Sequence, residues 1–302
     1  MLLSGLGLAQ NIEQKLIEIL AKGQKQGLAP PKLAIIHGND SPASKIYIKK
    51  KIEKCTQLGC QAELFSFSPF STKKEVLELV SKLNVDQKIH GILCQLPVFK
   101  HWDGNEILQA ISPKKDVDGL HPENMGLLLM EKPRFIPCTP QGILWLLDFY
   151  QFNLQGKHAF ILGRSSIVGR PLSILLSQKK RNMSVTLCHS YSKNWRSLVA
   201  LADLLIVAVG KPHLLSEETL KKDAIVIDVG VNSTLENGIS TTLGDVDTQK
   251  IEPKVAAVSQ VPGGVGPLTI VSLIYNLCLA AGYPCTQTEM AKPKVFSDKD
   301  PK

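Results

Sequence analysis

Residues 157–171 read KHAFILGRSSIVGRP, and this stretch decides the fold of the second half of the chain. An apolar run ends at Gly163, and Gly169 follows just before a helical pattern begins. The spacing is G-x-S-x-x-x-G rather than the G-x-G-x-x-G of the usual dinucleotide fingerprint. A strand, a tight glycine turn and a helix start nevertheless place backbone N–H groups where a pyrophosphate binds. By itself the motif leaves two interpretations open, a dinucleotide site or a turn that binds nothing.

Apolar segments of strand length alternate with helical segments on both sides of this motif. In the second half, we expect strands at 157–163, 184–189, 204–210 and 224–230 after a helix at 141–150. In the first half, we expect strands at 32–38, 62–67 and 89–97 with helices at 42–58 and 72–83. Such alternation is typical of parallel βαβ units. The sequence therefore predicts an α/β protein with two domains, the second of them a Rossmann-like parallel sheet.

The domain boundary is expected near residues 138–150, because the pattern becomes loop-rich between 111 and 140. A last helix carries Pro267 in its first turn and Gly282 at its end, as helix termini prefer. We expect this helix to pack back on the first domain. The predicted division is 1–140 completed by 267–283, then 141–266, then a tail over 284–302.

The end of the expected strand 184–189 indicates which dinucleotide is bound. An NAD-selective site usually places Asp or Glu there to hold the ribose 2′-hydroxyl, whereas an NADP site supplies a cation. Here Ser190 follows the strand with no acidic residue, and Arg164 stands in the glycine turn. This combination favours a 2′-phosphate and hence NADP. The alternative is that Arg164 is an ordinary surface arginine on a loop.

A lysine-rich segment, KIYIKKKIEK over residues 45–54, contains one lysine that differs from the others. At about 100° per residue, Lys51 lies about 60° from Ile48, inside an apolar stripe, whereas Lys49 and Lys50 point away. Tyr47 precedes Lys51 by one helical turn and shares its side of the helix. Lysine clusters on helices usually form a solvated surface, so the inward position of Lys51 needs a functional reason.

Three further segments are ambiguous when each is considered alone. Gln95 ends an apolar strand and so lies at the carboxyl edge of a sheet, where ligands of open α/β sheets bind. Asp118, followed by Gly119, is able to present a carboxylate to a polar heterocycle. The stretch VPGGVGP over 261–267 allows the backbone to approach a ligand closely. The corresponding structural explanations are a strand cap for Gln95, a solvated acidic loop for Asp118 and a tight turn for residues 261–267.

Composition excludes several classes of protein. The chain has 302 residues, 44% hydrophobic and 21% charged, with a net charge of +8, and it lacks the motifs of nucleic-acid binders. A phosphate-bearing cofactor or a polycarboxylate explains the positive charge as well as nucleic acid does. No metal-binding histidine or cysteine pattern, signal peptide or membrane-spanning segment is evident. Seven cysteines, an odd number without C-x-x-C, are expected to be reduced in a cytoplasmic protein.

Taken together and in this order, the motifs resemble the bifunctional methylenetetrahydrofolate dehydrogenase/cyclohydrolase family. The matching segments are GNDSPASKIYIKKK, GILCQLP, PKKDVDGLHPENMG, PCTPQG, GRSSIVGRP, ADLLIVAVGKP, VIDVGVN, GDVD and VPGGVGPLT, and they extend from about residue 38 to 270. The resemblance implies a homodimer of two-domain α/β subunits with a cleft between the domains. It also implies NADP⁺-dependent oxidation of 5,10-methylenetetrahydrofolate, then hydrolysis of the methenyl product to 10-formyltetrahydrofolate.

The resemblance also implies roles for individual residues. Tyr47 stacks on the folate, Lys51 is the catalytic group, Gln95 orients Lys51, and Asp118 holds the pterin. The further substrate-binding positions are Cys94, Leu96, Pro262, Gly263, Gly264, Val265, Gly266 and Pro267. The cofactor-binding positions are Gly163, Arg164, Ser165, Ile167, Gly169, Ser190 and Val231.

Three positions depart from the family pattern: Glu53 replaces a lysine, Ser259-Gln260 replaces Thr-Pro, and Val231 replaces isoleucine. The first of these is able to alter the pKa of Lys51 or the affinity for substrate. Three alternative functions stay open. They are a dehydrogenase without cyclohydrolase activity, which the presence of Lys51 disfavours, a non-catalytic dinucleotide-binding module, and a basic nucleic-acid binder.

Overall fold

The computed structural model describes residues 1–216, 218–236, 239–286 and 290, and it divides the chain into two compact units. Unit 1 contains Met1–Ile12, Thr139–Thr269 and the residues from Thr286 on, and unit 2 contains Glu13–Cys138 and Ile270–Cys285. Most of the expected tail over 284–302 lies outside the described residues. Each unit is described by itself below.

Unit 1 is built on a six-stranded sheet with the order β1-β11-β8-β7-β5-β6, in which every neighbouring pair is parallel. The strands are β1 (Leu2–Leu3), β5 (His158–Leu162), β6 (Ser184–Cys188), β7 (Leu204–Val207), β8 (Ile225–Asp228) and β11 (Ala257–Ser259). The four neighbouring strands β8, β7, β5 and β6 were predicted, because each is an apolar segment of strand length. Strands β11 and β1, which continue the sheet beyond β8, were not predicted, and neither was the hairpin of β9 (Asn232–Glu236) and β10 (Ile239–Leu243).

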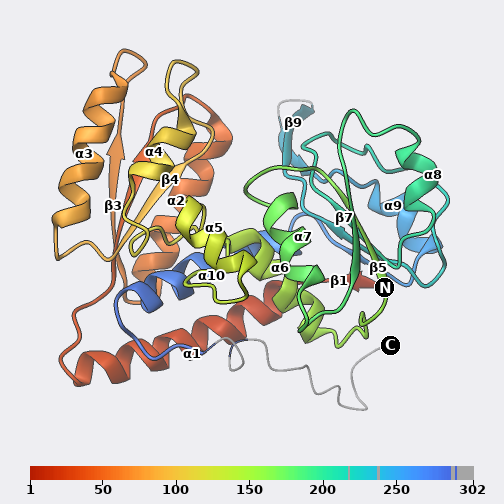
Figure 1. The fold of residues 1–302 in the computed structure, drawn as a ribbon, viewed down its shortest axis with the longest axis horizontal. Coiled ribbons are helices and arrows are strands. Elements are labelled where there is room, and N and C mark those ends of the chain that lie inside the picture. Colours follow the sequence, from red (N-terminus) through yellow and green to blue (C-terminus); the bar gives the residue numbers. More distant parts are fainter. Residues whose placement is uncertain (217, 237–238, 287–289, 291–302) are drawn as a thin grey trace. The chain divides into compact units, whose positions relative to one another are not determined.

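Helices lie on both sides of this sheet (Figure 1). They are α6 (Cys138–Phe149), α7 (Gly169–Ser177), α8 (Trp195–Val199) and α9 (Thr248–Ile251), the last continued by a 3₁₀ turn at Glu252–Lys254. In Figure 1, α6 and α7 are on one side and α8 and α9 on the other. A core of apolar side chains from β5, β7, β8 and the covering helices fills the space between helices and sheet. The Rossmann-like parallel sheet predicted for the second half of the chain is therefore confirmed.

Unit 2 is built on a three-stranded parallel sheet with the order β3-β2-β4. The strands are β2 (Lys32–His37), β3 (Gln61–Ser66) and β4 (Gly91–Gln95). The helices of this part of the chain are α2 (Pro42–Gln57), α3 (Lys73–Val85), α4 (Gly104–Ala110) and α5 (Pro122–Leu129). The long helices α1 (Leu6–Lys25) and α10 (Val265–Ala280) each have residues in both units.

The expectation of loop between residues 111 and 140 was wrong for the segment that forms α5. His121 caps this helix by accepting the amide of Glu123 at Nδ1, 3.0 Å away, and Pro122 occupies the first helical position. The helix has only eight residues, and one of them is Gly126. A segment so short, with glycine and proline in it, carries too little periodicity to be distinguished from loop by its sequence.

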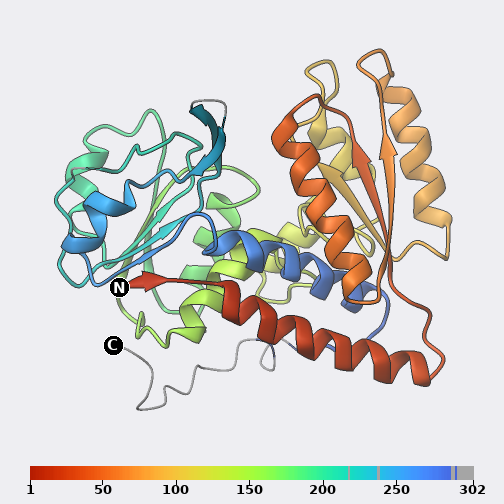
Figure 2. The ribbon, with the colours of Figure 1, turned by 180° about the vertical axis from the view of Figure 1, so that it is seen from behind.

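Helix α2, which carries the lysine-rich segment, begins where its sequence predicts. Ser41 caps it by accepting the amide of Ser44 at 3.5 Å, and Pro42 follows at the first helical position. The helix covers one face of the unit 2 sheet, which is clearest in Figure 2. Ile48 and Cys55 are buried there, whereas Lys49 and Lys50 are exposed. The apolar stripe inferred from helical angles is therefore confirmed. Among the described helices, none combines the length and apolarity needed to cross a membrane.

Candidate active site

Lys51 and Gln95 form a direct side-chain pair in unit 2. The Lys51 Nζ donates to the Gln95 Oε1 at 2.9 Å, although the two residues are 44 positions apart in the chain. The amide of Gln95 is held from its other end, because its Nε2 donates to the carbonyl of Leu96 at 3.0 Å. Since both ends of the amide are engaged, its oxygen faces the lysine and its orientation is fixed. Gln95 ends β4, as predicted, so the pair lies at the carboxyl edge of the sheet.

The surroundings of Lys51 lower the pKa of its amine. Burial is the main cause, because the charged form loses hydration, and the Asp118 carboxylate opposes the shift by favouring that form. The neighbouring lysine on the solvent side has a different environment. Lys49 has a side chain that is 78% exposed and pairs with Glu53 at 3.8 Å. Lys51 is thus held in surroundings that favour the neutral form of its amine.

Glu53, the departure from the family pattern two residues after Lys51, points away from the amine. Its carboxylate lies 3.8 Å from the Lys49 ammonium on the exposed side of α2. The groups that act on the Lys51 amine besides burial are Asp118, Cys138 and Cys55. The suspected influence of Glu53 on the pKa of Lys51 therefore has no basis in this geometry.

Tyr47 lies one turn before Lys51 on α2 and is half-buried. Burial raises the pKa of its phenol, so the ring is neutral at physiological pH. The ammonium of Lys50 lies 5.9 Å from the centre of the ring. An aromatic face beside an inward lysine provides a surface on which a flat ligand is able to stack.

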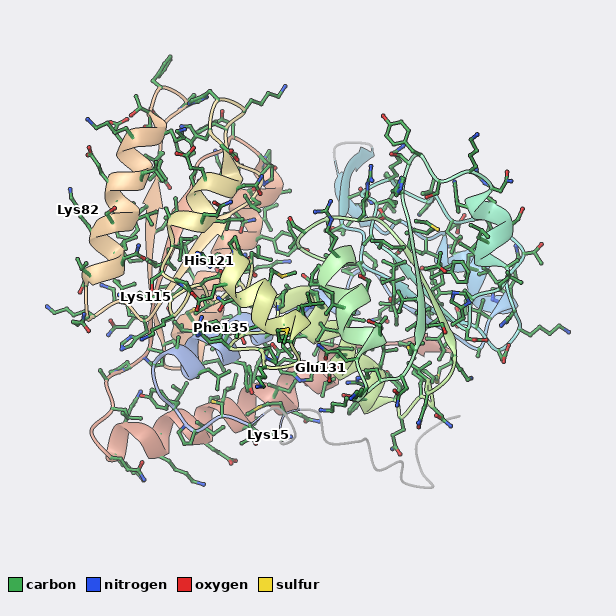
Figure 3. The ribbon with its side chains drawn as sticks, in the orientation of Figure 1. Lys15, Lys82, Lys115, His121, Glu131 and Phe135 are labelled. Carbon is green, nitrogen blue, oxygen red and sulfur yellow. The ribbon has the colours of Figure 1, made fainter. Side chains whose placement is uncertain are left out.

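The loop that carries Asp118 runs along the edge of the sheet. The amide of Ile92 in β4 donates to the carbonyl of Lys115 at 2.7 Å, and Asp116 forms a parallel bridge with Ile92. This pairing places Asp118 at the same carboxyl edge as Gln95. Gly119 then turns the chain with φ of +73°, and a Cβ there would lie 3.0 Å from the nitrogen of Pro137. Figure 3 labels Lys115 and His121, which flank this turn.

Two residues near this group were missed in the sequence. Cys138, at the start of α6, donates its thiol to the carbonyl of Val117 at 3.5 Å; burial and the adjacent Asp118 carboxylate raise the pKa of this thiol far above its usual value. Asn39 donates to the carbonyl of Pro97 at 2.6 Å and so fastens the chain before α2 to the loop after Gln95. Cys138 lies within the PCTPQG segment and Asn39 within the GNDSPASKIYIKKK segment, so membership of these two segments was the available signal.

Cys94 and Leu96, the other substrate-binding residues predicted in unit 2, stand directly before and after Gln95. Cys94 is 3% exposed, and burial, followed by the charge of Asp118, raises the pKa of its thiol to about 12. Its side chain points to the face of the sheet opposite Gln95, because successive residues of a strand alternate. Leu96 supplies the carbonyl that holds the Gln95 amide, and the peptide bond to Pro97 is cis.

The glycine turn of unit 1 requires both of its glycines. Gly163 has φ of +118°, and a Cβ there would lie 2.1 Å from the carbonyl oxygen of Ala208. A Cβ on Gly169 would lie 1.9 Å from the carbonyl oxygen of Gly163. Ser165 closes the turn by accepting the amide of Val168 at its Oγ, 3.1 Å away. The turn therefore brings the start of α7 close to the end of β5, as a pyrophosphate site requires.

The residues that face solvent around this turn fit a phosphate-bearing dinucleotide. Arg164 and Ser165 are exposed in the turn, Ile167 is half-buried, and Ser190 is exposed after the end of β6. Val231 is 45% exposed after β8. A guanidinium and a hydroxyl, without a carboxylate among these positions, form a donor set suited to a 2′-phosphate. The sequence-predicted cofactor residues thus lie at the ends of β5, β6 and β8 in one sheet.

Two buried carboxylates fix the loops at this edge of unit 1. Asp245 accepts the amides of Val209, Gly210 and Lys211 at 2.7–2.9 Å. Asp228 accepts the amides of Gly230, Asp245 and Val246 at 2.9–3.0 Å. Burial raises the pKa of Asp228 to about 6, with these hydrogen bonds opposing the shift. Both carboxylates shape backbone rather than face solvent, so they belong to the framework of the cofactor edge.

The VPGGVGP loop, also in unit 1, is tightly packed against its own chain. The amide of Gly5 donates to the carbonyl of Gly263 at 2.8 Å, and a Cβ on Gly264 would lie 2.5 Å from the carbonyl oxygen of Gln260. Gln260, a departure from the family pattern, donates to the hydroxyl of Ser4 at 3.2 Å. Pro262 is exposed, Val265 begins α10, and the half-buried Gly266 and Pro267 follow within its first turn.

Within the described ranges, no group of three or more histidine, cysteine or acidic side chains has an arrangement able to hold a metal ion.

Comparison with known proteins gives a consistent result over most of the chain. The catalytic-domain profile of the tetrahydrofolate dehydrogenase/cyclohydrolase family matches residues 3–118, and the family's NAD(P)-binding-domain profile matches residues 137–284. The bifunctional protein FolD of Chlamydia caviae is 45% identical over 282 residues, which cover 91% of this chain and 96% of that protein.

Solved structures agree with this match. The crystal structure of the bifunctional enzyme FolD from Campylobacter jejuni superposes with a TM-score of 0.87 at 39% identity, covering 93% of this chain and 98% of that one. The Trypanosoma brucei FolD structure, solved with NADP and an inhibitor, gives a TM-score of 0.88 at 29% identity, with coverage of 93% and 97%.

Proposed function

The chain belongs to the tetrahydrofolate dehydrogenase/cyclohydrolase family, and we propose that it carries out both reactions of that family with the residues described above. The first reaction is oxidation of 5,10-methylenetetrahydrofolate to the methenyl form with NADP⁺. The second is hydrolysis of the methenyl form to 10-formyltetrahydrofolate. The single observation that carries the proposal is the half-buried Lys51 amine, bonded to Gln95 at 2.9 Å and acted on by Asp118.

Lys51 is assigned to the hydrolysis step as the group that takes and returns protons. A free lysine has a pKa near 10.4 and is almost wholly protonated at neutral pH. Burial at this site lowers that pKa, which increases the fraction of neutral amine. Gln95 accepts a hydrogen bond from the amine in either protonation state, so it fixes the position of the nitrogen as the proton moves.

Tyr47 and Asp118 are assigned to substrate binding. The neutral ring of Tyr47 offers a stacking surface next to Lys51 on α2. Asp118 presents an acceptor carboxylate that suits the N–H donors of a pterin, and it also limits how far the pKa of Lys51 falls. The backbone at Cys94 and Leu96 and the loop from Pro262 to Pro267, with Gly263, Gly264, Val265 and Gly266, complete the assigned substrate-binding positions.

NADP is assigned to the glycine turn of unit 1. Arg164 and Ser190 are the donors for its 2′-phosphate, and the turn from Gly163 through Ser165 and Ile167 to Gly169 holds its pyrophosphate. Val231 contacts the cofactor from the end of β8. When bound, NADP⁺ supplies the hydride acceptor of the oxidation. The protein's own contribution to that step is positioning, since hydride transfer needs chiefly a fixed arrangement of the two reactants.

Two further properties are part of the proposal. The enzyme acts as a homodimer, as the family resemblance implies, and sedimentation at micromolar concentration tests this. It works in the cytoplasm, which fits seven cysteines that all lie within the described residues and form no disulfide there. A stable monomer or secretion of the protein would contradict the respective statement.

Two spectrophotometric assays on purified protein test the proposed function. One follows reduced cofactor with 5,10-methylenetetrahydrofolate and either NADP⁺ or NAD⁺, and the other follows loss of 5,10-methenyltetrahydrofolate. We expect activity in both, with NADP⁺ preferred. Oxidation without hydrolysis would favour the dehydrogenase-only alternative, and no activity in either assay would refute the proposal.

A further inference from the structure

The turn that carries Asp118 is fastened by a second carboxylate, that of Asp116. This side chain is 1% exposed, and its Oδ2 accepts the amide of His121 at 2.7 Å and the Nδ2 of Asn124 at 2.8 Å. The amide of Gly119 donates to the carbonyl of Asp116 at 3.1 Å, which closes the turn over residues 116–119. The Asp116 carboxylate therefore ties His121, which follows the turn, to the residue at which the turn begins.

Asn124 holds this carboxylate and has no spare hydrogen-bonding group on its nitrogen. The side chain is fully buried, and its Nδ2 donates both to Asp116 and to the carbonyl of Pro113 at 2.9 Å. Its Oδ1 accepts the Nη1 of Arg134 at 2.7 Å. The arginine thus decides which way the amide faces, because a flipped amide would point its N–H groups at the guanidinium.

Arg134 is the cation at the end of this chain of contacts. Its Nη2 pairs with the Glu123 carboxylate at 2.7 Å, and its side chain is 29% exposed. The guanidinium fork therefore bridges two neighbouring residues of α5, the helix that directly follows the Asp118 turn. Its positive charge also lies at the end of a hydrogen-bonded path to the buried Asp116 carboxylate. Figure 3 labels His121, which directly precedes α5, and Phe135, which directly follows Arg134 in the sequence.

We propose that Arg134 is a positioning residue for the folate site, acting through Asn124 and Asp116 to hold the 116–119 turn and thereby Asp118. The inference rests on the assignment of Asp118 to substrate binding made under the proposed function. Without the guanidinium, the Oδ1 of Asn124 loses its charged donor, and the amide is held only through the two hydrogen bonds of its Nδ2. Asp118 then loses its fixed place relative to the substrate and to Lys51.

The test compares Arg134→Ala with Arg134→Lys and with a matched control, Arg181→Ala. Arg181 also makes a two-pronged pair with a carboxylate, that of Asp148, and its side chain is 19% exposed, but it lies in unit 1. We expect Arg134→Ala to raise the KM for 5,10-methylenetetrahydrofolate about tenfold, with the KM for NADP⁺ unchanged. The lysine variant is expected to recover part of this loss, because its ammonium still reaches one of the two acceptors. Arg181→Ala should leave the folate KM unchanged.

A second readout separates positioning from general loss of structure. After burial, the Asp118 carboxylate is the largest influence on the pKa of the Lys51 amine, and it favours the protonated form. Displacing Asp118 removes a group that favours the protonated amine, so the pH profile of hydrolysis should shift to lower pH in Arg134→Ala. Thermal melts of the variants identify any that are unfolded, and in that case the lysine variant carries the test.

Asp118→Ala distinguishes failure of this inference from failure of the proposed function. A raised folate KM in Asp118→Ala, with an unchanged folate KM and pH profile in Arg134→Ala, would overturn the positioning role and leave the proposed function intact. An unchanged folate KM in Asp118→Ala would remove Asp118 from the site and the inference with it. Equal losses in Arg134→Ala and Arg181→Ala would also overturn the inference, since they would indicate general destabilisation.

Discussion

Replacing Gly163 by alanine should abolish the cofactor site and spare the hydrolytic one. The backbone at this position has φ of +118°, a region that costs a residue with a Cβ about 1–3 kcal/mol. The added methyl would also lie 2.1 Å from the carbonyl oxygen of Ala208. The surrounding chain has little freedom to yield, because the amides of Gly163 and Ala208 are both hydrogen-bonded between strands, at 2.9 and 2.8 Å.

The size of the effect follows from these two costs. Steric overlap in a packed site costs about 1–3 kcal/mol in addition to the backbone strain. The native geometry of the turn is therefore destabilised by about 2–6 kcal/mol in the alanine variant. The lower figure alone corresponds to a loss of affinity of about 30-fold. We therefore expect the KM for NADP⁺ to rise by at least about 30-fold. Hydrolysis of 5,10-methenyltetrahydrofolate should change less than about threefold, because Lys51, Gln95 and Asp118 lie in unit 2.

Gly156→Ala is the matched control. Gly156 is also in unit 1 and has φ of +74°, but a Cβ there would meet nothing within 4 Å. This variant carries backbone strain without overlap and without proximity to the glycine turn, so both activities should survive. The measurements are steady-state rates for each reaction and a thermal melt of each variant. A KM for NADP⁺ in Gly163→Ala within about threefold of the unsubstituted protein would refute the reasoning.

Three other substitutions test separate parts of the site. Lys51→Met should reduce hydrolysis about a hundredfold or more while NADP binding, measured by fluorescence titration, survives; Lys50→Met, on the exposed side of α2, should change neither. Arg164→Ser should raise the KM for NADP⁺ about tenfold or more and leave that for NAD⁺ unchanged, because a charged hydrogen bond contributes about 1.5–3 kcal/mol. Asp228 has a pKa of about 6 in the folded protein against 3.8 for a free group, so the native state holds a proton that the unfolded state has released between these values. Stability should therefore fall as pH rises from about 4 to 6, by about 3 kcal/mol from this group. Urea titrations should show this fall to be smaller in Asp228→Asn, and equal slopes in both proteins would contradict the assignment.

Local pattern was sufficient for the elements that bury continuous apolar segments. The strands β5, β7 and β8 were predicted from continuous apolar segments, and the helix α2 was predicted from apolar residues at helical spacing. Strand β1 has two residues, and it exists only because β11 pairs with it from the other end of the chain, at Leu2 with Val258. No periodicity is possible in so short a segment. Such elements are determined by long-range pairing and not by local sequence.

The same division applies to the candidate site. The inward side of α2 identified Lys51, and the end of β4 identified Gln95, since each is a property of one element. The side-chain contacts between these elements, in contrast, depend on the tertiary structure. The contact of Asn39 with Pro97 spans 58 positions. Both residues lie in segments that match the family, but nothing in either segment predicts that they touch. The contacts of Arg134 could not be predicted either, because an arginine in a loop-rich segment has no local feature that distinguishes it from a solvated arginine.

The balance at Lys51 explains why the site needs both a buried lysine and a nearby carboxylate. Burial alone favours the neutral amine, and a lysine that never carries a proton has none to return to the leaving nitrogen. The Asp118 carboxylate favours the protonated form and so counters part of that shift, but burial remains the larger influence and the pKa stays below its usual value. Gln95 serves either state because its oxygen accepts from an amine as well as from an ammonium. The position and the lowered pKa of the Lys51 amine therefore depend on burial, Asp118 and Gln95 together, and Glu53, paired with Lys49 on the exposed side of α2, is not one of these influences.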